Sequence, residues 1–172
     1  MRLLPILPIL LVLLALQLSA EAPVPAGASY DLGFSPGGTS LTVVLKAVAS
    51  AKVSILVAAY EFTSREIADA LLAAEVRGVK VQVVADFKAS HDRASVLNRL
   101  RRGNIPVRLD GRYAIHHKFM VIDVETLETG SFNFTEAAVK HNAENALVLW
   151  HVAPLAQEYA KEWNRLWAES AD

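Results

Sequence analysis

The sequence predicts a single-domain α/β protein in which a mixed β-sheet is sandwiched between helical layers. Its 172 residues, 53% of them hydrophobic and 20% charged, suit one compact domain with a sizeable core. Short apolar runs rich in β-branched residues alternate along the chain with amphipathic helical patterns, which is typical of a sheet covered by helices. The chain has no cysteine, so the core must stabilise the domain without a disulfide.

Residues 1–22 are predicted to be a secretory signal peptide. They combine a positive charge at Arg2 with an apolar run over residues 3–18 and then small residues. Cleavage after Ala20 or Ala22 fits the small-x-small pattern, and an uncleaved membrane anchor is the alternative. We therefore expect an exported protein, periplasmic or secreted, without stable membrane association once the leader is removed.

The predicted domain covers residues 39–172, and an exposed leader rich in Pro, Gly and Ala precedes it over residues 23–38. Early in the domain, Thr63 and Glu66 have the spacing of a capping box, and Gly78 is suited to end the helix that they begin. The apolar runs on either side of this helix are typical of strands covered on both faces. The expected elements of this half are helices over 39–51, 63–78 and about 90–103, and strands over 52–60 and 79–86.

The second half of the domain predicts three more strands and two more helices. The last helix begins at Pro154, since proline is favoured in the first turn. We expect its broad apolar face to pack in the core, as amphipathic helices do. That face consists of Leu155, Tyr159, Trp163, Leu166 and Trp167. The other expected elements are strands over 105–109, 116–123 and 146–150, and a short helix over 135–141.

Costly polar groups gather on the expected strand that begins HHK at residue 116. Side chains two apart on a strand project from the same face, so His116 and Lys118 should point together and His117 should point away. The same rule pairs Ser131 with Asn133 if the backbone is extended there. Such a set could bind one anion, with the lysine supplying charge and the histidine a nitrogen that attacks or donates a proton. Taken alone, however, a histidine on an apolar strand is more often a hydrogen-bonded core residue.

The whole pattern is more specific than any one of its residues. It reads H-x-K-x4-D-x6-G-S-x-N at His116, Lys118, Asp123, Gly130, Ser131 and Asn133. This stretch resembles the HKD motif of the phospholipase D superfamily at every position. It is most similar to the small bacterial periplasmic endonucleases of that superfamily, which share the leader, the single motif, the segment TGSFNFT over 129–135 and the ENA over 144–146.

The resemblance implies a role for each matching residue. His116 would be the nucleophile that attacks phosphorus and forms a phosphohistidine. Lys118, Ser131 and Asn133 would bind the non-bridging phosphate oxygens. Glu144 would hydrogen-bond the far nitrogen of His116 and so select its tautomer, as a histidine nucleophile requires.

Two residues near the nucleophile are expected to support it rather than react. Asp123 belongs to the motif, but its odd offset from Lys118 places it off the phosphate-facing side of a straight strand. His117 should be packed or hydrogen-bonded on the opposite face. A zinc site made by His116 and His117 is not expected, because adjacent strand residues diverge and no third ligand has a recognisable spacing. We predict no metal and no cofactor.

A single motif predicts a homodimer. Cleaving a phosphodiester through a covalent histidine requires one neutral imidazole to attack and a second, protonated group to donate to the leaving alkoxide. Longer members of the superfamily carry two HKD motifs, whereas this chain carries one. A two-fold symmetric dimer would place His116 and its symmetry mate on opposite sides of one phosphate.

The substrate is the least determined part of the prediction. The net charge is −1, so a nucleic acid would have to be held by a local patch. Five arginines precede the histidines and are candidates for phosphate binding, although they could equally form a solvated helix face and loop. They are Arg99, Arg101, Arg102, Arg108 and Arg112. We expect a nonspecific endonuclease acting on DNA, and also on RNA; a phospholipase D-type lipid phosphodiesterase or phosphatidyltransferase and a non-catalytic nucleic-acid-binding dimer are the alternatives.

Overall fold

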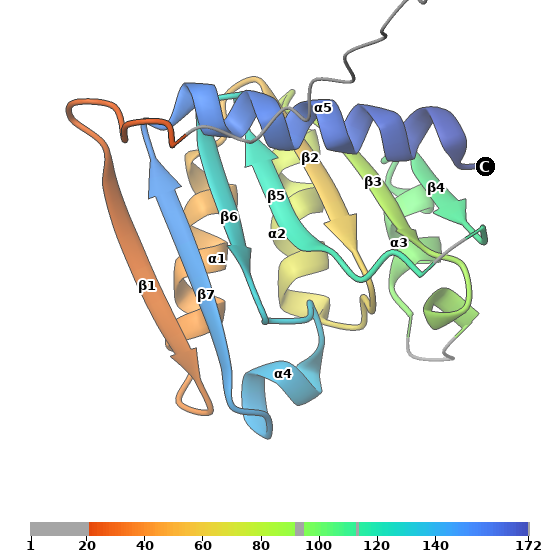
Figure 1. The fold of residues 1–172 in the computed structure, drawn as a ribbon. Helices are drawn as coiled ribbons and strands as arrows, with labels where there is room; N and C mark the ends of the chain where they lie inside the picture. Colours follow the sequence, from red (N-terminus) through yellow and green to blue (C-terminus); the bar gives the residue numbers. More distant parts are fainter. Residues whose placement is uncertain (1–20, 92–94, 113, 172) are drawn as a thin grey trace, which may run out of the picture.

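The fold was described from a computed structural model, which covers residues 21–91, 95–112 and 114–171. A seven-stranded sheet of order β1-β7-β6-β5-β2-β3-β4 carries helices on both faces (Figure 1), so the predicted fold class is confirmed. The predicted signal peptide lies, apart from residues 21 and 22, outside the described residues. The strands are β1 (Ser29–Ser35), β2 (Ser54–Ala59), β3 (Lys80–Asp86), β4 (Val107–Asp110), β5 (Lys118–Ile122), β6 (Thr126–Gly130) and β7 (Glu144–Trp150). The helices are α1 (Thr39–Ser50), α2 (Arg65–Val76), α3 (Leu97–Arg102), α4 (Glu136–Lys140) and α5 (Ala153–Glu169), with one 3₁₀ turn at Ala89–His91.

The sheet divides into a parallel and an antiparallel half. Strands β2, β3 and β4 run parallel, so their carboxyl ends lie at the same end of the sheet. Strand β5 runs antiparallel to β2, with Lys118 opposite Ala59. The beginning of β5, with Lys118 in it and His116 just before it, therefore lies at the same end of the sheet as the carboxyl ends of β2 and β3.

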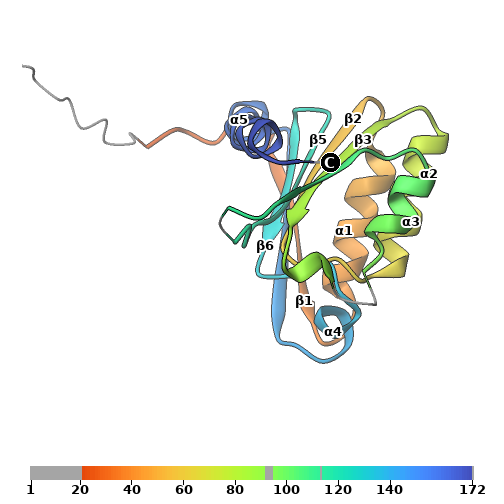
Figure 2. The same ribbon diagram turned by 90° about the vertical axis from the view of Figure 1, so that its right-hand side faces the viewer.

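The two faces of the sheet are covered unequally. Helices α1, α2 and α3 cover one face, and α5 crosses the other face (Figure 2). Successive side chains of β5 point to opposite faces of the sheet and so enter two separate cores. Met120 packs in the core under α1 and α2, whereas Phe119 packs in the core under α5. On α5, Trp163 is fully buried and its indole N–H donates to the Val57 carbonyl at 2.8 Å. The predicted packing of this helix face is thus confirmed, except that Leu155 stays 40% exposed.

The segment 105–110 and the end of the described chain also pair with each other. Leu109 and Ala171 exchange two backbone hydrogen bonds, of 2.7 and 3.1 Å. Because β4 is the edge strand, this pairing satisfies polar groups that an open edge would expose. It also holds the end of α5 beside β4.

Two strands were missed in the sequence. Strand β1 lies within the segment predicted as an exposed leader, so the domain begins before residue 39 and that boundary is corrected. It pairs with β7 over seven residues, but its Gly- and Pro-rich surroundings predict an exposed loop and not a strand. Strand β6 follows a tight turn directly after β5, and its mixed polarity lacks the apolar run of a buried strand.

Three local predictions also need correction. The N-cap of α2 is Ser64, whose hydroxyl accepts from the Ile67 amide, and not Thr63. The single helix expected over about 90–103 is a 3₁₀ turn and a separate α3, with residues 92–94 outside the described part. Strand β5 begins at Lys118, so His116 and His117 precede it instead of lying in it.

Within the described ranges, no helix has both the length and the apolarity needed to cross a membrane.

Candidate active site

His116 and Lys118 lie together at the start of β5. The Lys118 ammonium is 3.0 Å from the His116 Nδ1 and donates to the His116 carbonyl oxygen at 2.7 Å. Only 7% of Lys118 is exposed. The expectation that these two side chains point together is therefore confirmed, although a side-chain hydrogen bond holds them and not the strand ladder.

Tyr60 and Glu61, which follow β2, complete the surroundings of this pair. The Tyr60 ring lies 4.7 Å from the His116 ring between centroids, and the Lys118 ammonium lies 5.2 Å over it. Burial lowers the pKa of Lys118, while the nearby carboxylates of Glu144 and Glu61 act in the opposite direction. The lysine is thus a largely buried cation with two anions close by.

Ser131 and Glu144 form a second polar group at the end of the sheet where β5 begins. The Ser131 hydroxyl donates to the Glu144 carboxylate at 2.6 Å and accepts from the Asn145 amide at 3.1 Å. The Asn142 side chain donates to the other Glu144 oxygen at 3.1 Å. Among the described residues no hydrogen bond joins Glu144 to His116, so the expected contact is absent from the single chain, and Ser131 takes its place.

Asn133 has hydrogen-bonding capacity that the single chain does not use. Its Oδ1 is buried and has no partner among the described residues. The backbone nearby is well anchored, because the Thr63 and Ser64 amides both donate to the Phe134 carbonyl, at 3.0 and 2.9 Å. These bonds hold the segments after β2 and β6 against each other, so that Asn133 lies close to the residues that follow β2.

The motif glycine is required by a close approach of two backbones. Gly130 ends β6 opposite Ala146 of β7. A Cβ at Gly130 would overlap the carbonyl oxygen of Asn145. Any larger residue would push β7 away and separate Ser131 from Glu144.

A cleft of about 380 Å³ opens beside His116. Its floor is formed by β5 and β6 and its wall by α5. The lining residues are His116, His117, Lys118, Phe119, Thr129, Gly130, Glu158, Tyr159 and Glu162. A buried cation and an imidazole in one cleft, with the neutral donors Ser131 and Asn133 following Gly130 in the chain, are groups suited to hold and attack a phosphodiester.

Comparison with known proteins agrees with this arrangement. A family model described as "Cardiolipin synthase, PLD-like domain" matches residues 44–167, which is most of the chain. The chain belongs to the phospholipase D superfamily. The crystal structure of a phospholipase D family member, Nuc from Salmonella typhimurium, is similar with a TM-score of 0.83 and 40% identity, covering 84% of this chain and 97% of Nuc.

Two curated relatives in the phospholipase D superfamily have lipid-related names. Mitochondrial cardiolipin hydrolase from Canis lupus familiaris is 32% identical over 155 residues, which are 90% of this chain and 61% of that protein. Phospholipase D from Rickettsia conorii is 36% identical over 131 residues, which are 76% of this chain and 65% of that protein. This chain therefore spans about two-thirds of the length of these relatives.

The aspartate of the superfamily's HKD motif is placed away from the cleft. Asp123 begins the turn after β5, and its carboxylate accepts from the backbone amides of Lys52, Val53 and Ser54 at 3.0, 2.8 and 2.9 Å. It thus joins the start of β2 to the end of β5. This position agrees with the predicted supporting role.

His117 points away from Lys118, toward α5. Its Nε2 lies 3.5 Å from a Glu162 carboxylate oxygen, and its ring contacts Phe119 edge-on at 5.6 Å. The expectation that His117 is packed or hydrogen-bonded on the opposite face is confirmed. No cluster of three or more His, Cys, Asp or Glu side chains that could hold a metal occurs in the described part of the chain.

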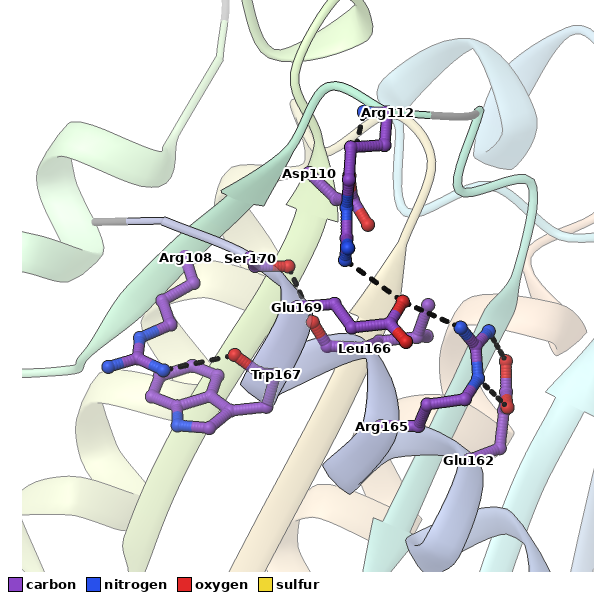
Figure 3. A network of polar contacts seen from close by, with 9 residues as sticks. All are labelled: Arg108, Asp110, Arg112, Glu162, Arg165, Leu166, Trp167, Glu169 and Ser170. Atoms are coloured by element: carbon purple, nitrogen blue, oxygen red, sulfur yellow. Dashed lines mark hydrogen bonds and ion pairs between the residues drawn. The ribbon is translucent and has the colours of Figure 1, made fainter.

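The five predicted phosphate-binding arginines do not form one patch. Arg99 pairs with Asp69 of α2, and Arg101 donates to the Val107 carbonyl at 3.2 Å. Arg108 and Arg112 contact the end of α5 (Figure 3): Arg108 donates to the Trp167 carbonyl at 3.0 Å, and Arg112 pairs with Glu169 at 2.9 Å. Arg102 is exposed on α3. Substrate binding by these arginines stays a prediction, and the structure gives four of them internal partners.

Sequence reasoning missed three residues that shape the site. Tyr60 and Glu61 follow β2, and Asp86 ends β3 as a buried carboxylate that accepts from the Ile115 amide at 3.1 Å. Asp86 thereby supports the segment before His116. A signal was available, because all three follow apolar runs, and the carboxyl ends of parallel strands are where α/β proteins place their sites.

Proposed function

We propose that the protein is a metal-independent phosphodiesterase and acts as a nonspecific endonuclease on DNA, and on RNA through the same chemistry. The observation that carries the proposal is the buried Lys118 ammonium, 3.0 Å from the His116 imidazole. A fixed cation at this place would stabilise the negative charge that develops on phosphorus, which is the largest contribution in many phosphoryl transfers.

In the proposed mechanism, a nitrogen of His116 attacks phosphorus and the bond from phosphorus to the leaving oxygen breaks. The products are a phosphohistidine and an alcohol, whose oxygen takes a proton from a second acid. Water then attacks the phosphohistidine, loses its proton to that second group and restores the free imidazole. Lys118, Ser131 and Asn133 would hold the non-bridging oxygens, and Glu144 would orient the imidazole after exchanging its bond to Ser131.

The second acid is proposed to be His116 of another copy of the chain. The surface available for that copy is the exposed face of β1. Tyr30, Leu32 and Phe34 alternate along this strand and are 67%, 47% and 58% exposed. They lie on the same side of the sheet as α5, because Gly33 between them faces α1. Helix α5 packs on β2 to β6, so this apolar stripe is free to bury itself in a two-fold symmetric interface.

Two observations favour a nucleic acid over a lipid. The chain is 40% identical to Nuc and covers 97% of it, whereas it is 32% and 36% identical to the two lipid-named relatives and covers 61% and 65% of them. The motif and its flanking TGSFNFT and ENA segments likewise resemble the small periplasmic endonucleases. Export by the N-terminal leader, which we also propose, would bring such an enzyme to foreign nucleic acid.

The names of the relatives support the second candidate, a lipid phosphodiesterase or phosphatidyltransferase with the same catalytic groups. One assay separates the two. The purified protein is incubated in excess EDTA with labelled plasmid, with RNA and with phosphatidylcholine vesicles, and the His116→Ala variant serves as the control. We expect the plasmid and the RNA to be cut by the wild-type protein alone. An intact plasmid beside hydrolysed lipid would overturn the choice of substrate, and loss of cutting in EDTA would overturn the metal-free mechanism.

A further inference from the structure

The segment that carries the nucleophile is not held by the strand ladder. Residues 111–117 connect β4 to β5 and have no regular secondary structure where they are described. Two buried carboxylates hold the backbone from one side: Asp110 accepts from the Arg112 amide at 2.8 Å, and Asp86 accepts from the Ile115 amide at 3.1 Å. The Arg112 side chain and His117 extend from the same segment toward helix α5.

Helix α5 contacts the segment through the side chains of Arg112 and His117. The Arg112 guanidinium pairs with Glu169 at 2.9 Å, and His117 lies 3.5 Å from Glu162. Glu162 and Glu169 are two turns apart on α5, so both project from the same face of the helix. The two contacts thus flank His116 and its neighbours from a single rigid element.

Arg165 joins the two carboxylates. It makes hydrogen bonds of 2.9 and 2.7 Å with both oxygens of Glu162 and one of 2.7 Å with Glu169 (Figure 3). These hydrogen bonds lower the pKa of Glu162 below its usual value, so the carboxylate is charged at neutral pH. A bidentate arginine is geometrically selective, and it presents both carboxylates to the segment in fixed places.

We propose that Glu162 and Glu169 of α5, aligned by Arg165, are positioning residues that hold the segment 111–117 and thereby orient His116 for attack. None of the three acts on the substrate's phosphorus. They act through Arg112 and His117, and the role rests on the phosphodiesterase function proposed above. Arg112 is accordingly a structural partner of α5 and not a ligand of the substrate.

The two roles for Arg112 predict opposite results for Glu169→Gln. If Arg112 binds substrate phosphate, removing Glu169 should take away one of its two internal anions, leaving Asp110 at 3.5 Å, and lower KM. If Arg112 positions the nucleophile, the same change should lower kcat and leave KM alone, since small displacements of a reacting group cost rate. Exposed ion pairs contribute little to stability, so the variant should still fold.

The test measures kcat and KM on a labelled oligonucleotide, on which a phosphate-binding Arg112 would change KM, and on bis(p-nitrophenyl) phosphate, a diester too small to reach a distant phosphate site. The variants are Arg112→Gln, Glu169→Gln and the double variant, with Glu136→Gln, which removes the Glu136–Lys140 ion pair of α4, as the matched control. We expect kcat to fall by about tenfold in each single variant. The double variant should lose no more than either single one, because the two residues act as a pair. The control should match the wild type.

Several results would overturn the proposal: a kcat within twofold of wild type, additive losses in the double variant, or a rise in KM confined to Arg112→Gln. Hydrogen exchange of the peptide 111–117 supplies a readout without activity. The amides of this peptide should exchange faster in Glu169→Gln, while the rest of the sheet stays protected. If the wild type cleaves no diester, the proposed function fails, but hydrogen exchange still decides whether α5 holds the segment.

Discussion

Glu128 is the residue whose placement is most costly in the fold. It lies in the middle of β6 between Met120 and Val148, fully buried, and neither carboxyl oxygen has a hydrogen-bond partner among the described residues. Burial raises its pKa from the usual 4.5 to about 8. The folded protein therefore keeps a proton on Glu128 at pH values where the unfolded chain has lost it.

The consequence is a stability that falls as pH rises. Between pH 4.5 and about 8 the unfolded chain releases the Glu128 proton and the folded chain does not, so unfolding becomes more favourable with each pH step. We expect Glu128→Gln, which mimics the protonated form, to equal the wild type near pH 4 and to gain roughly 3 kcal/mol by pH 7. Urea unfolding at several pH values measures the difference.

The cross-strand neighbour supplies the control for Glu128. Met120→Leu changes the same layer of the core without a titratable group, so any change in stability should be the same at every pH. A difference between Glu128→Gln and wild type that does not grow with pH would show that Glu128 has a proton-donating partner or is charged in the folded state.

At the scale of elements, β1 and α5 occupy different parts of the sheet face that lies opposite α1, α2 and α3. Helix α5 covers β2 to β6 and is tied to the segment before β5 and to the edge strand β4. Strand β1 presents its apolar stripe to solvent beside β7. An edge strand with exposed aromatic and aliphatic side chains favours association, and here the association is proposed to be functional.

We expect Leu32→Lys to dissociate the proposed homodimer. The change places a charge in the middle of the apolar stripe, whose burial would then require desolvating an unpaired ammonium. The molar mass in solution, measured by light scattering after size exclusion, should fall to that of one chain, and diesterase activity should fall with it. Val76→Lys, at an 88% exposed position on α2, is the matched control and should keep both mass and activity. A monomeric but fully active Leu32→Lys protein would contradict the assignment of the second acid.

At the scale of the whole molecule, the proposed chemistry needs two chains. Each chain supplies one imidazole and one buried ammonium, and one imidazole cannot attack and also protonate the leaving group in the same step. The pair would titrate as a coupled unit around a shared phosphate. The two-fold axis of the dimer would therefore pass through the reaction centre.

Heterodimers test this arrangement directly. Wild-type and His116→Ala chains carrying different affinity tags are co-expressed, and the mixed dimer is isolated by two affinity steps. We expect almost no cleavage of plasmid, because the mixed dimer has lost one of its two required groups. A mixed dimer with half of the wild-type activity would show that each subunit works alone.

The sequence was most informative where chemistry demands particular residues at particular spacings. The HKD pattern indicated the superfamily, and the 3.6-residue and continuous apolar patterns indicated α1, α2, α5 and the buried strands. It was least informative for β1, whose partner β7 is far away in the chain, and for β6, whose mixed polarity lacks an apolar run. Tyr60, Glu61 and Asp86 were missed because only the pairing of β2 with β3 and with β5 brings them close to His116.

By itself the sequence determined the α/β class, the superfamily and the residues of the HKD motif, because local periodicity and motif spacing are properties of the chain alone. Only the tertiary structure decided how these residues are held. It gave Glu144 to Ser131, bonded Asp123 to the backbone amides at the start of β2, and tied Arg108 and Arg112 to α5. Partners such as these are chosen by distance and burial between segments far apart in the chain, which no local pattern records.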